Sequence, residues 1–594
     1  MITLCDKKIA QIKTSFFSLS FSAHCVIGNC RNWNDFLFKM GVNGLTTFVK
    51  QQKLYHHIDI LEEIRKHRKA NGNALIIFDV MGFVHNFGAT VVELNLGGRQ
   101  HIYLHQFEQF LQALQKAGAM LAFFCDGQLQ ADKNDVWCRR RDADFQAALA
   151  LINEHSHQDG TKKRFGCKTI VKSLLKMVED KRYGKVVIST EVDCDKAIAK
   201  YAMSKGALAV VASDSDFLIF EGDFQWWDSK SIRMHQMTAK RFERNQLRQK
   251  LSLTSEQLKY FATIVGNDHT GHMITKRCDF IKVAHFCQSI DSERCNPQSI
   301  YQKIGKYMLF GSSKPIDIES IARSIQSYDA NYDIAQCRNP MNDYCSANVL
   351  MFAFWHQQVF QYEVNFVDFK PRHEDGKNNN VQLFLDTLIE VFRKLGGILL
   401  NGISHTNPML KIVTKYSLYE KYMLREYTPI YPEGMAEIED IIFGKNIDDK
   451  WNLLLWSIGI DVQLRFDLDS IPKRYVHTVL ALIFLLKANE ITSLQADALL
   501  LCQYNIFEGK FDLESINIDE TVVSKEVIRV GQLFSRTITL IWDCFMVCGL
   551  SEYIQMDWFD GPYFSYLLVR CQRLKAFHNE SLTKIRSYRL YAPQ

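Results

Sequence analysis

Residues 40–290 alternate between short apolar runs and longer segments with helical spacing, and this alternation limits the folds that the chain can adopt. The apolar runs lie at residues 74–78, 121–125, 185–188 and 207–212. Segments between them, such as 103–117 and 195–204, repeat apolar residues at helical intervals. Buried strands that alternate with helices predict an α/β fold with a doubly wound, mostly parallel sheet.

Three of the four runs end beside an aspartate. Asp79 and Asp126 each follow a run directly, and Asp214 stands two residues after another run, with Asp216 close behind it. In open α/β sheets the carboxyl ends of the parallel strands line the binding crevice. We therefore expect these acidic side chains to converge at one edge of the sheet.

A second acidic pair, Asp193 and Asp195, and the single Asp268 complete the set. A lone D-x-D pair also occurs in glycosyltransferases, calcium loops and solvated turns, so neither pair decides the function by itself. Two like charges about 5 Å apart repel each other by about 3 kcal/mol at an effective dielectric of about 20. Gathered carboxylates therefore require cations or raised pKa values, and Mg²⁺ prefers carboxylate and water oxygens. A sugar- or nucleotide-transferring enzyme that uses one D-x-D pair leaves Asp79, Asp126 and Asp268 without a role.

The bulk composition permits a phosphate-rich partner without requiring one. The 594 residues carry a net charge of +5, with 47% apolar and 23% charged residues, as in ordinary globular proteins. The 16 cysteines form no CxxC pair and no zinc-finger spacing, which indicates a reducing, intracellular compartment; we favour the nucleus over the cytoplasm. The best apolar run, 479–486, is much shorter than the roughly 20 residues that span a bilayer, so we expect no membrane partner.

Four segments carry a resemblance to a known family. Residues 40–45 (MGVNGL) are similar to the N-terminal signature of the flap endonuclease and xeroderma pigmentosum group G superfamily, whose nuclease domain is PIN-like. Residues 124–127 (FCDG) and 266–268 (GND) match two of its acidic motifs. Within the superfamily, the paired elements in 191–220 (EVDCDK and SDSDFLIF) resemble those of the asteroid proteins.

The resemblance implies a metal centre with two Mg²⁺ ions, for which Mn²⁺ can substitute. Its acidic positions are filled here by Asp79, Asp126, Asp193, Asp195, Asp214, Asp216 and Asp268. By the resemblance, Asp126 and Asp195 hold one ion, Asp214 and Asp216 hold the other, and the remaining three ligate directly or through water. Two such ions activate water and stabilise the leaving oxygen of a phosphodiester.

The resemblance also assigns contacts to nucleic acid. Lys133 and Arg140 correspond to a catalytic lysine and arginine that clamp the scissile phosphate from a helical arch. Arg139 and Arg141 extend this basic run and are candidate nucleic-acid contacts, although three consecutive arginines also fit a solvated helix face. His85 lies where the superfamily places an aromatic that stacks on a base, and a plain surface or core histidine fits equally well.

Three departures from the superfamily pattern bear on the function. Proteins of the superfamily usually begin at the methionine of the signature, but here residues 1–39 precede it. In the superfamily, the glycine that corresponds to Gly41 packs near the active site and the nucleic acid. We expect this extension to be disordered or to come from a wrongly placed start. Residues 271–277 lack the repeated glycines of the hairpin that grips duplex phosphates, and the chain has no sliding-clamp motif.

These observations predict three parts after residues 1–39. A PIN-like nuclease domain spans 40–290, a helical connector spans 291–380 and includes a polar linker at 372–380, and a mainly helical domain spans 381–594. The predicted function is that of a metal-dependent, structure-selective endonuclease of the asteroid type, which hydrolyses single-stranded or branched DNA, or RNA. The alternative is a catalytically silent asteroid-like adaptor that keeps the nuclease fold and binds nucleic acid or protein.

Overall fold

The chain divides into two units, Met1–Lys39 and Met40–Gln594, and every residue described below belongs to the second. The computed structural model describes residues 41–84, 96–127, 129, 134–153, 169–189, 193–274, 278–291, 295–310, 315–329, 348–362, 384–402, 408–417, 420–510, 524–555 and 559–574. The polar linker expected at 372–380 lies outside these residues.

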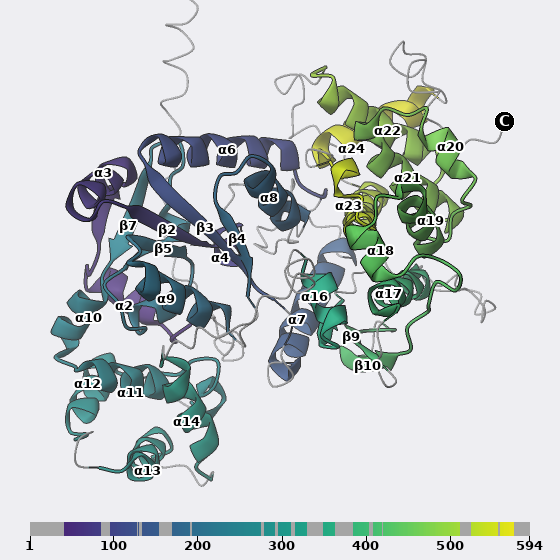
Figure 1. Cartoon of the computed structure of the whole chain (residues 1–594). Helices are drawn as coiled ribbons and strands as arrows, with labels where there is room; N and C mark the ends of the chain where they lie inside the picture. Colours follow the sequence, from purple (N-terminus) through teal and green to yellow (C-terminus); the bar gives the residue numbers. More distant parts are fainter. Residues whose placement is uncertain are drawn as a thin grey trace, which may run out of the picture. The chain divides into compact units, whose positions relative to one another are not determined.

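Residues 56–242 contain a seven-stranded sheet (Figure 1). Its strands are β1 (His56–Asp59), β2 (Ala74–Asp79), β3 (Ala119–Cys125), β4 (Lys185–Ile188), β5 (Ala209–Ala212), β6 (Gln225–Asp228) and β7 (Thr238–Phe242). They lie in the order β1-β7-β6-β5-β2-β3-β4. The five strands from β6 to β4 run parallel, and β7 is antiparallel to both of its neighbours. The predicted mostly parallel α/β sheet is therefore confirmed, and the four predicted runs are its adjacent strands β5, β2, β3 and β4.

Helices cover both faces of this sheet. Successive side chains of a strand point to opposite faces, so an apolar strand such as β2 needs a hydrophobic core on each face. Ile76 and Phe78 of β2 belong to one hydrophobic core, and Leu75 and Ile77 belong to the other. The first core is covered by α3 (Ile60–Asn71), α6 (Gln100–Lys116) and α8 (Thr169–Asp180). The second is covered by α2 (Leu45–Gln51), α9 (Cys194–Lys205), α10 (Arg244–Leu251) and α11 (Ser255–Val265).

The second core continues past residue 290, where we expected the nuclease-like domain to end. It includes side chains of α12 (Phe280–Gln288), α13 (Pro297–Met308) and α14 (Ile318–Ser327), and it ends at Tyr328. Figure 1 shows these helices grouped around α11. The three helices are therefore packed as part of the nuclease-like fold.

The C-terminal region is mainly helical, as predicted, but it also contains a small sheet that the sequence pattern did not reveal. The strands β8 (Val359–Gln361), β9 (Leu410–Thr414) and β10 (Met423–Tyr427) lie in the order β10-β9-β8. The described helices of this region are α16 (Val349–Trp355), α17 (Phe384–Leu400), α18 (Ile438–Phe443), α19 (Ile447–Ser457), α20 (Leu464–Leu468), α21 (Lys473–Lys487), α22 (Ser493–Phe507), α23 (Lys525–Val547) and α24 (Gly561–Leu574). In the described part of the chain, no helix combines the length and the apolar character needed to cross a membrane.

Helix α7 (Asn134–Asn153) follows β3 and packs against the C-terminal sheet. The Nζ of Lys415, just after β9, lies 2.9 Å from Oδ1 of Asp142 and 4.4 Å from the centre of the Phe145 ring. Trp137 meets Tyr422 edge to face at 5.5 Å. Because the Lys415 side chain is only 2% exposed, its charge is stabilised mainly by Asp142 and by neighbouring aromatic faces.

We predict that the two halves of this ion pair respond unequally to substitution. Asp142→Ala leaves a buried cation without its counter-charge, and it should lower the free energy of unfolding by about 3 kcal/mol. Lys415→Met keeps the apolar stem and leaves a carboxylate that still reaches water, so its cost should stay below about 1.5 kcal/mol. Urea unfolding of both variants measures the difference. Equal costs for the two variants would show that Asp142 does not stabilise the buried charge.

Candidate metal centre

Acidic residues stand at the carboxyl ends of three adjacent parallel strands. Asp79 is the last residue of β2, Asp126 follows β3 directly, and Asp214 follows β5 by two residues. Since β5, β2 and β3 are neighbours in the sheet, their parallel direction brings the three carboxylates to one edge. The convergence of the strand-end acids is therefore a consequence of the sheet topology.

Local hydrogen bonds fix these aspartates to the backbone. The carboxylate of Asp79 accepts from the N–H of Gly82 at 3.1 Å. Asp193 caps α9 and accepts from the N–H of Asp195, and Asp214 caps the short helix Ser215–Leu218 and accepts from the N–H of Asp216, each at 3.2 Å. Capping explains why aspartate suits positions 193 and 214. It gives no reason for an acid at positions 195 and 216.

Asp195, Asp214 and Asp216 form the tightest group. One carboxylate oxygen from each lies within 4.8 Å of the other two. Burial raises the pKa of both Asp195 and Asp216 well above its usual range, and the charge of Asp214 adds to the effect. The resemblance implied that Asp195 holds one ion and that Asp214 and Asp216 hold the other. In the structure all three residues lie in one group.

Two members of the acidic set have pKa values near neutrality. Burial raises the pKa of Asp79 to about 7, with a further contribution from the charge of Asp126. Burial also raises the pKa of Asp214 to about 7; backbone hydrogen bonds from Asp216 and Ser215 oppose this shift, and the charges of Asp268 and Asp193 add to it. The mutual influence of these residues shows that the seven aspartates form one electrostatic cluster.

The remaining members lie toward the solvent. Asp126 and Asp268 are exposed, and Asp193 is partly buried. The charge of Asp268 raises the pKa of both Asp214 and Asp216. The cluster therefore extends from the buried Asp214 to carboxylates that are exposed to solvent.

Gly41 lies against the buried group. Its φ is +81°, and a Cβ at this position would fall 1.9 Å from Oδ1 of Asp214 and 3.0 Å from Oγ of Ser215. Any larger residue would displace the Asp214 carboxylate, which explains the need for glycine here. Gly41 thus packs directly against the Asp214 carboxylate. The contact with nucleic acid that we expected for Gly41 stays a prediction.

The three arginines of α7 point in different directions, as consecutive residues of a helix must. Nη2 of Arg140 lies 3.0 Å from Oδ1 of Asp268 and so joins α7 to the acidic cluster. Nε of Arg139 donates to the carbonyl of Asp135 in the same helix. Arg141 stacks over the Trp137 ring at 5.7 Å. Arg140 therefore forms an ion pair with a member of the acidic cluster.

Two of the predicted contacts, Lys133 and His85, lie outside the described residues. Two other residues, which the sequence did not reveal, belong to the site. Tyr328 donates a hydrogen bond to Asp216 at 2.9 Å, and Asn267 contacts the Tyr328 hydroxyl at 3.1 Å. Asn267 sits inside the matched GND motif, which could have identified it. No motif marks Tyr328.

The donor set fits a hard divalent cation. Carboxylate oxygens make up the group, and these are the ligands that Mg²⁺ and Mn²⁺ prefer. The nearby thiols do not compete, because burial raises the pKa of Cys125 and Cys194 far above its usual range and keeps them protonated. The buried negative charge that three ionised carboxylates would create is the reason to expect a cation there.

Sequence comparison finds relatives of this chain among animal proteins. The chain is 24% identical over 240 residues to the human constitutive coactivator of peroxisome proliferator-activated receptor gamma, and 23% and 24% identical to the cow and mouse proteins. Each alignment covers 39% of this chain, but only 26%, 33% and 30% of the human, cow and mouse proteins. The match thus spans about a quarter to a third of the relatives' length. No protein-family model matches the chain.

Structural comparison finds nucleases in complex with DNA and alone. The catalytic core of Rad2 with a DNA substrate is 10% identical, with a TM-score of 0.32 over 53% of this chain and 93% of that core. Human GEN1 with Holliday junction DNA is 13% identical, with a TM-score of 0.30 over 67% of this chain and 90% of that one. Flap endonuclease-1 from Methanococcus jannaschii is 13% identical, with a TM-score of 0.27 over 47% of this chain and 97% of that enzyme.

The topology of the sheet and the sequence relatives together place the chain. Its parallel strands end in a cluster of carboxylates, which is the arrangement that the flap-endonuclease resemblance implied. The chain thus has an α/β fold with a mostly parallel sheet, similar to that of the flap-endonuclease type, and in sequence it is similar to the constitutive coactivators of peroxisome proliferator-activated receptor gamma.

Proposed function

We propose that this protein is a metal-dependent nuclease that hydrolyses phosphodiester bonds of DNA or RNA. The observation that carries the proposal is the group of Asp195, Asp214 and Asp216, in which Asp214 is buried and the other two are partly buried, and one carboxylate oxygen from each lies within 4.8 Å of the other two. Structural needs do not explain it, because gathered carboxylates repel one another and destabilise a fold unless a cation or protons neutralise them. Its position at the carboxyl edge of a parallel sheet suits a binding crevice.

The seven aspartates provide ligands for two divalent ions. Asp195, Asp214 and Asp216 hold one divalent ion, Asp79 and Asp126 offer oxygens to a second, and Asp193 and Asp268 bind directly or through water. When bound, two such ions supply an activated water and stabilise the leaving oxygen. The carboxylates fix the ions in place, and Gly41 lets the backbone approach Asp214 without displacing it.

Arg140 supplies the positive charge on the side of α7. It now pairs with Asp268 at 3.0 Å, and both side chains are partly exposed. A scissile phosphate can take the place of Asp268, because guanidinium groups bind phosphate in the same forked geometry as carboxylate. Lys133, at the start of the same segment, is assigned the same role by resemblance. Developing negative charge on the phosphate is then stabilised by these cations.

A second function is favoured by the names of the sequence relatives, which are coactivators. In this alternative the protein is a catalytically silent adaptor that binds nucleic acid or protein through the nuclease fold. It requires no metal chemistry. Loss of the metal ligands distinguishes the two functions, because an adaptor keeps its binding without them.

The decisive experiment is cleavage of end-labelled single-stranded, flap and duplex DNA, and of matching RNAs, with Mg²⁺, Mn²⁺ or EDTA. Asp214→Asn/Asp216→Asn should reduce the cleavage rate by more than about a hundredfold, since even the loss of a residue that only hydrogen-bonds to a metal ligand costs about 10–100-fold. The matched control is Asp467→Asn/Asp469→Asn, an exposed D-x-D pair in and after α20, which should cut like the wild type. If wild type and both variants are equally inert but bind the same nucleic acid, the adaptor function replaces the nuclease.

The arginines of α7 provide a second test. Arg140→Gln should lower kcat/KM by about a hundredfold, because it removes a cation from the developing phosphate charge. Arg139→Gln, on the exposed side of the same helix, should change kcat/KM by less than about threefold. Kinetics on the best substrate from the cleavage assay measure both values. A similar decrease in kcat/KM for the two variants would indicate that the helix attracts nucleic acid only through its total positive charge. Arg140 would then have no specific role at the scissile phosphate.

The raised pKa values predict how metal binding depends on pH. Asp79 and Asp214, with pKa values near 7 in the fold, hold protons at pH values where the unfolded chain is ionised. The metal-free protein should therefore lose stability as the pH rises from about 4 to about 7, and metal should stabilise it more at about pH 8 than at about pH 5.5. Thermal unfolding with Mg²⁺ or EDTA measures this. A metal effect independent of pH would contradict it.

A further inference from the structure

Tyr328 approaches the acidic cluster from a part of the chain that carries no nuclease motif. It follows α14 directly and is 2% exposed. Its hydroxyl lies 2.9 Å from Oδ1 of Asp216. A buried phenol in contact with a candidate metal ligand has two explanations: it fills the core and satisfies its own hydroxyl, or it holds the carboxylate in place.

The direction of this hydrogen bond follows from Asn267. Oδ1 of Asn267 accepts from the N–H of His269 at 3.0 Å and of Thr270 at 3.2 Å, which fixes the orientation of the amide. Its Nδ2 therefore faces Tyr328 Oη at 3.1 Å and Ser324 Oγ at 2.8 Å. Because an amide NH₂ only donates, the Tyr328 oxygen accepts from Asn267 and its own hydrogen goes to Asp216.

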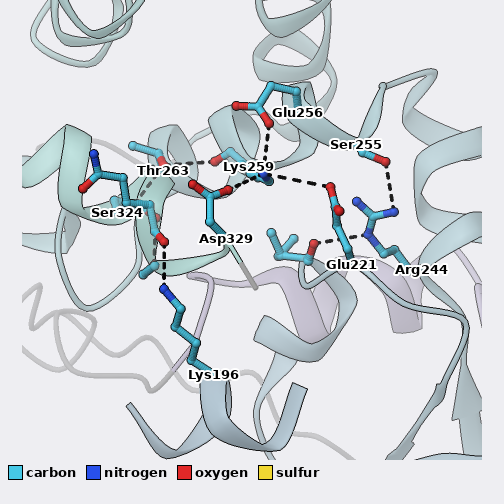
Figure 2. A network of polar contacts seen from close by, with 12 residues as sticks. Lys196, Glu221, Arg244, Ser255, Glu256, Lys259, Thr263, Ser324 and Asp329 are labelled. Atoms are coloured by element: carbon cyan, nitrogen blue, oxygen red, sulfur yellow. Dashed lines mark hydrogen bonds and ion pairs between the residues drawn. The ribbon is translucent and has the colours of Figure 1, made fainter. Parts of the chain in front are cut away.

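The same reasoning assigns donor and acceptor to the hydroxyl groups of Thr263 and Ser324 (Figure 2). Thr263 Oγ1 donates to the carbonyl of Lys259 at 3.0 Å. The Ser324 hydroxyl, 2.8 Å from Thr263 Oγ1, must therefore donate to it. Thr263 and Ser324 are fully buried, so no water reorients these groups. The network has one consistent arrangement of hydrogens, and in it Asp216 is an acceptor.

An ion cluster holds the backbone beside Tyr328. Nζ of Lys259 in α11 lies 2.5 Å from Oδ1 of Asp329 and 3.0 Å from Oε2 of Glu256, while its side chain is 8% exposed. Figure 2 shows Lys259 between Asp329 and Glu256, with Glu221 on a third side. Since Asp329 is the next residue after Tyr328, this cluster fixes the end of α14 against α11.

We propose that Tyr328 is a positioning residue for the metal ligand Asp216. Its O–H occupies Oδ1, sets the rotation of the carboxylate, and leaves Oδ2 free for a divalent cation shared with Asp195 and Asp214. Partners of this kind orient metal ligands in many sites. The inference rests on the proposed function, because it requires that the acidic group bind a metal.

The test is Mn²⁺ binding to the full chain, measured by titration calorimetry and by the electron paramagnetic resonance signal of free Mn²⁺. Tyr328→Phe removes only the hydroxyl and should weaken Mn²⁺ binding by about tenfold or more. The matched control is Tyr563→Phe in α24, whose buried hydroxyl also accepts from an amide, that of Asn505 at 2.6 Å. It should lose similar thermal stability but keep the affinity for Mn²⁺.

Ser324→Ala provides a second variant in case Tyr328→Phe does not fold. It releases one N–H of Asn267 and should weaken Mn²⁺ binding less than Tyr328→Phe does. If the wild type binds Mn²⁺ and both folded variants bind it equally well, the positioning role is wrong while the proposed metal site stands. If the wild type itself binds no Mn²⁺, the proposed function fails and the inference fails with it.

Discussion

Repulsion among carboxylates is the constraint on which the arrangement of this protein depends. Asp195, Asp214 and Asp216 meet within 4.8 Å at the carboxyl edge of the sheet, where burial raises the pKa of each. A fold tolerates such a group only if rigid neighbours hold it and a cation or protons neutralise it. The helix caps provided by Asp193 and Asp214, and the close approach of Gly41, supply that rigidity.

Helix α7 connects the acidic cluster with the C-terminal region. On one side Arg140 pairs with Asp268, and on the other Asp142 pairs with the buried Lys415. The flap-endonuclease resemblance assigns this segment to an arch over the substrate. Here the described part of the helix is packed against the C-terminal sheet, so the C-terminal region takes part in placing Arg140 beside the acidic cluster. This gives a mainly helical region, which carries no recognised chemistry, a structural reason to accompany the nuclease fold.

The sequence predicted the central sheet well because the signal was local. Each run from β2 to β5 is a short apolar segment flanked by helical periodicity; β2 and β5 are buried on both faces, and β4 at the sheet edge is only partly buried. The strands β8, β9 and β10 were not predicted: β10 is mostly exposed and carries no apolar run, and β8 pairs with β9 from about 50 residues away. The core that covers one face of the sheet continues beyond residue 290 into α13 and α14, because their attachment depends on contacts rather than on composition.

The sequence by itself determined the α/β class and the positions of the aspartates at the strand ends, because periodicity and the order of residues are properties of short stretches of chain. Tertiary structure alone decided which carboxylates lie together, that Arg140 pairs with Asp268, and that Tyr328 donates a hydrogen bond to Asp216 from 112 residues away. These features depend on the rotation of helices and on the packing of α14 against α11. Such contacts join segments whose separation in the sequence leaves no periodic trace.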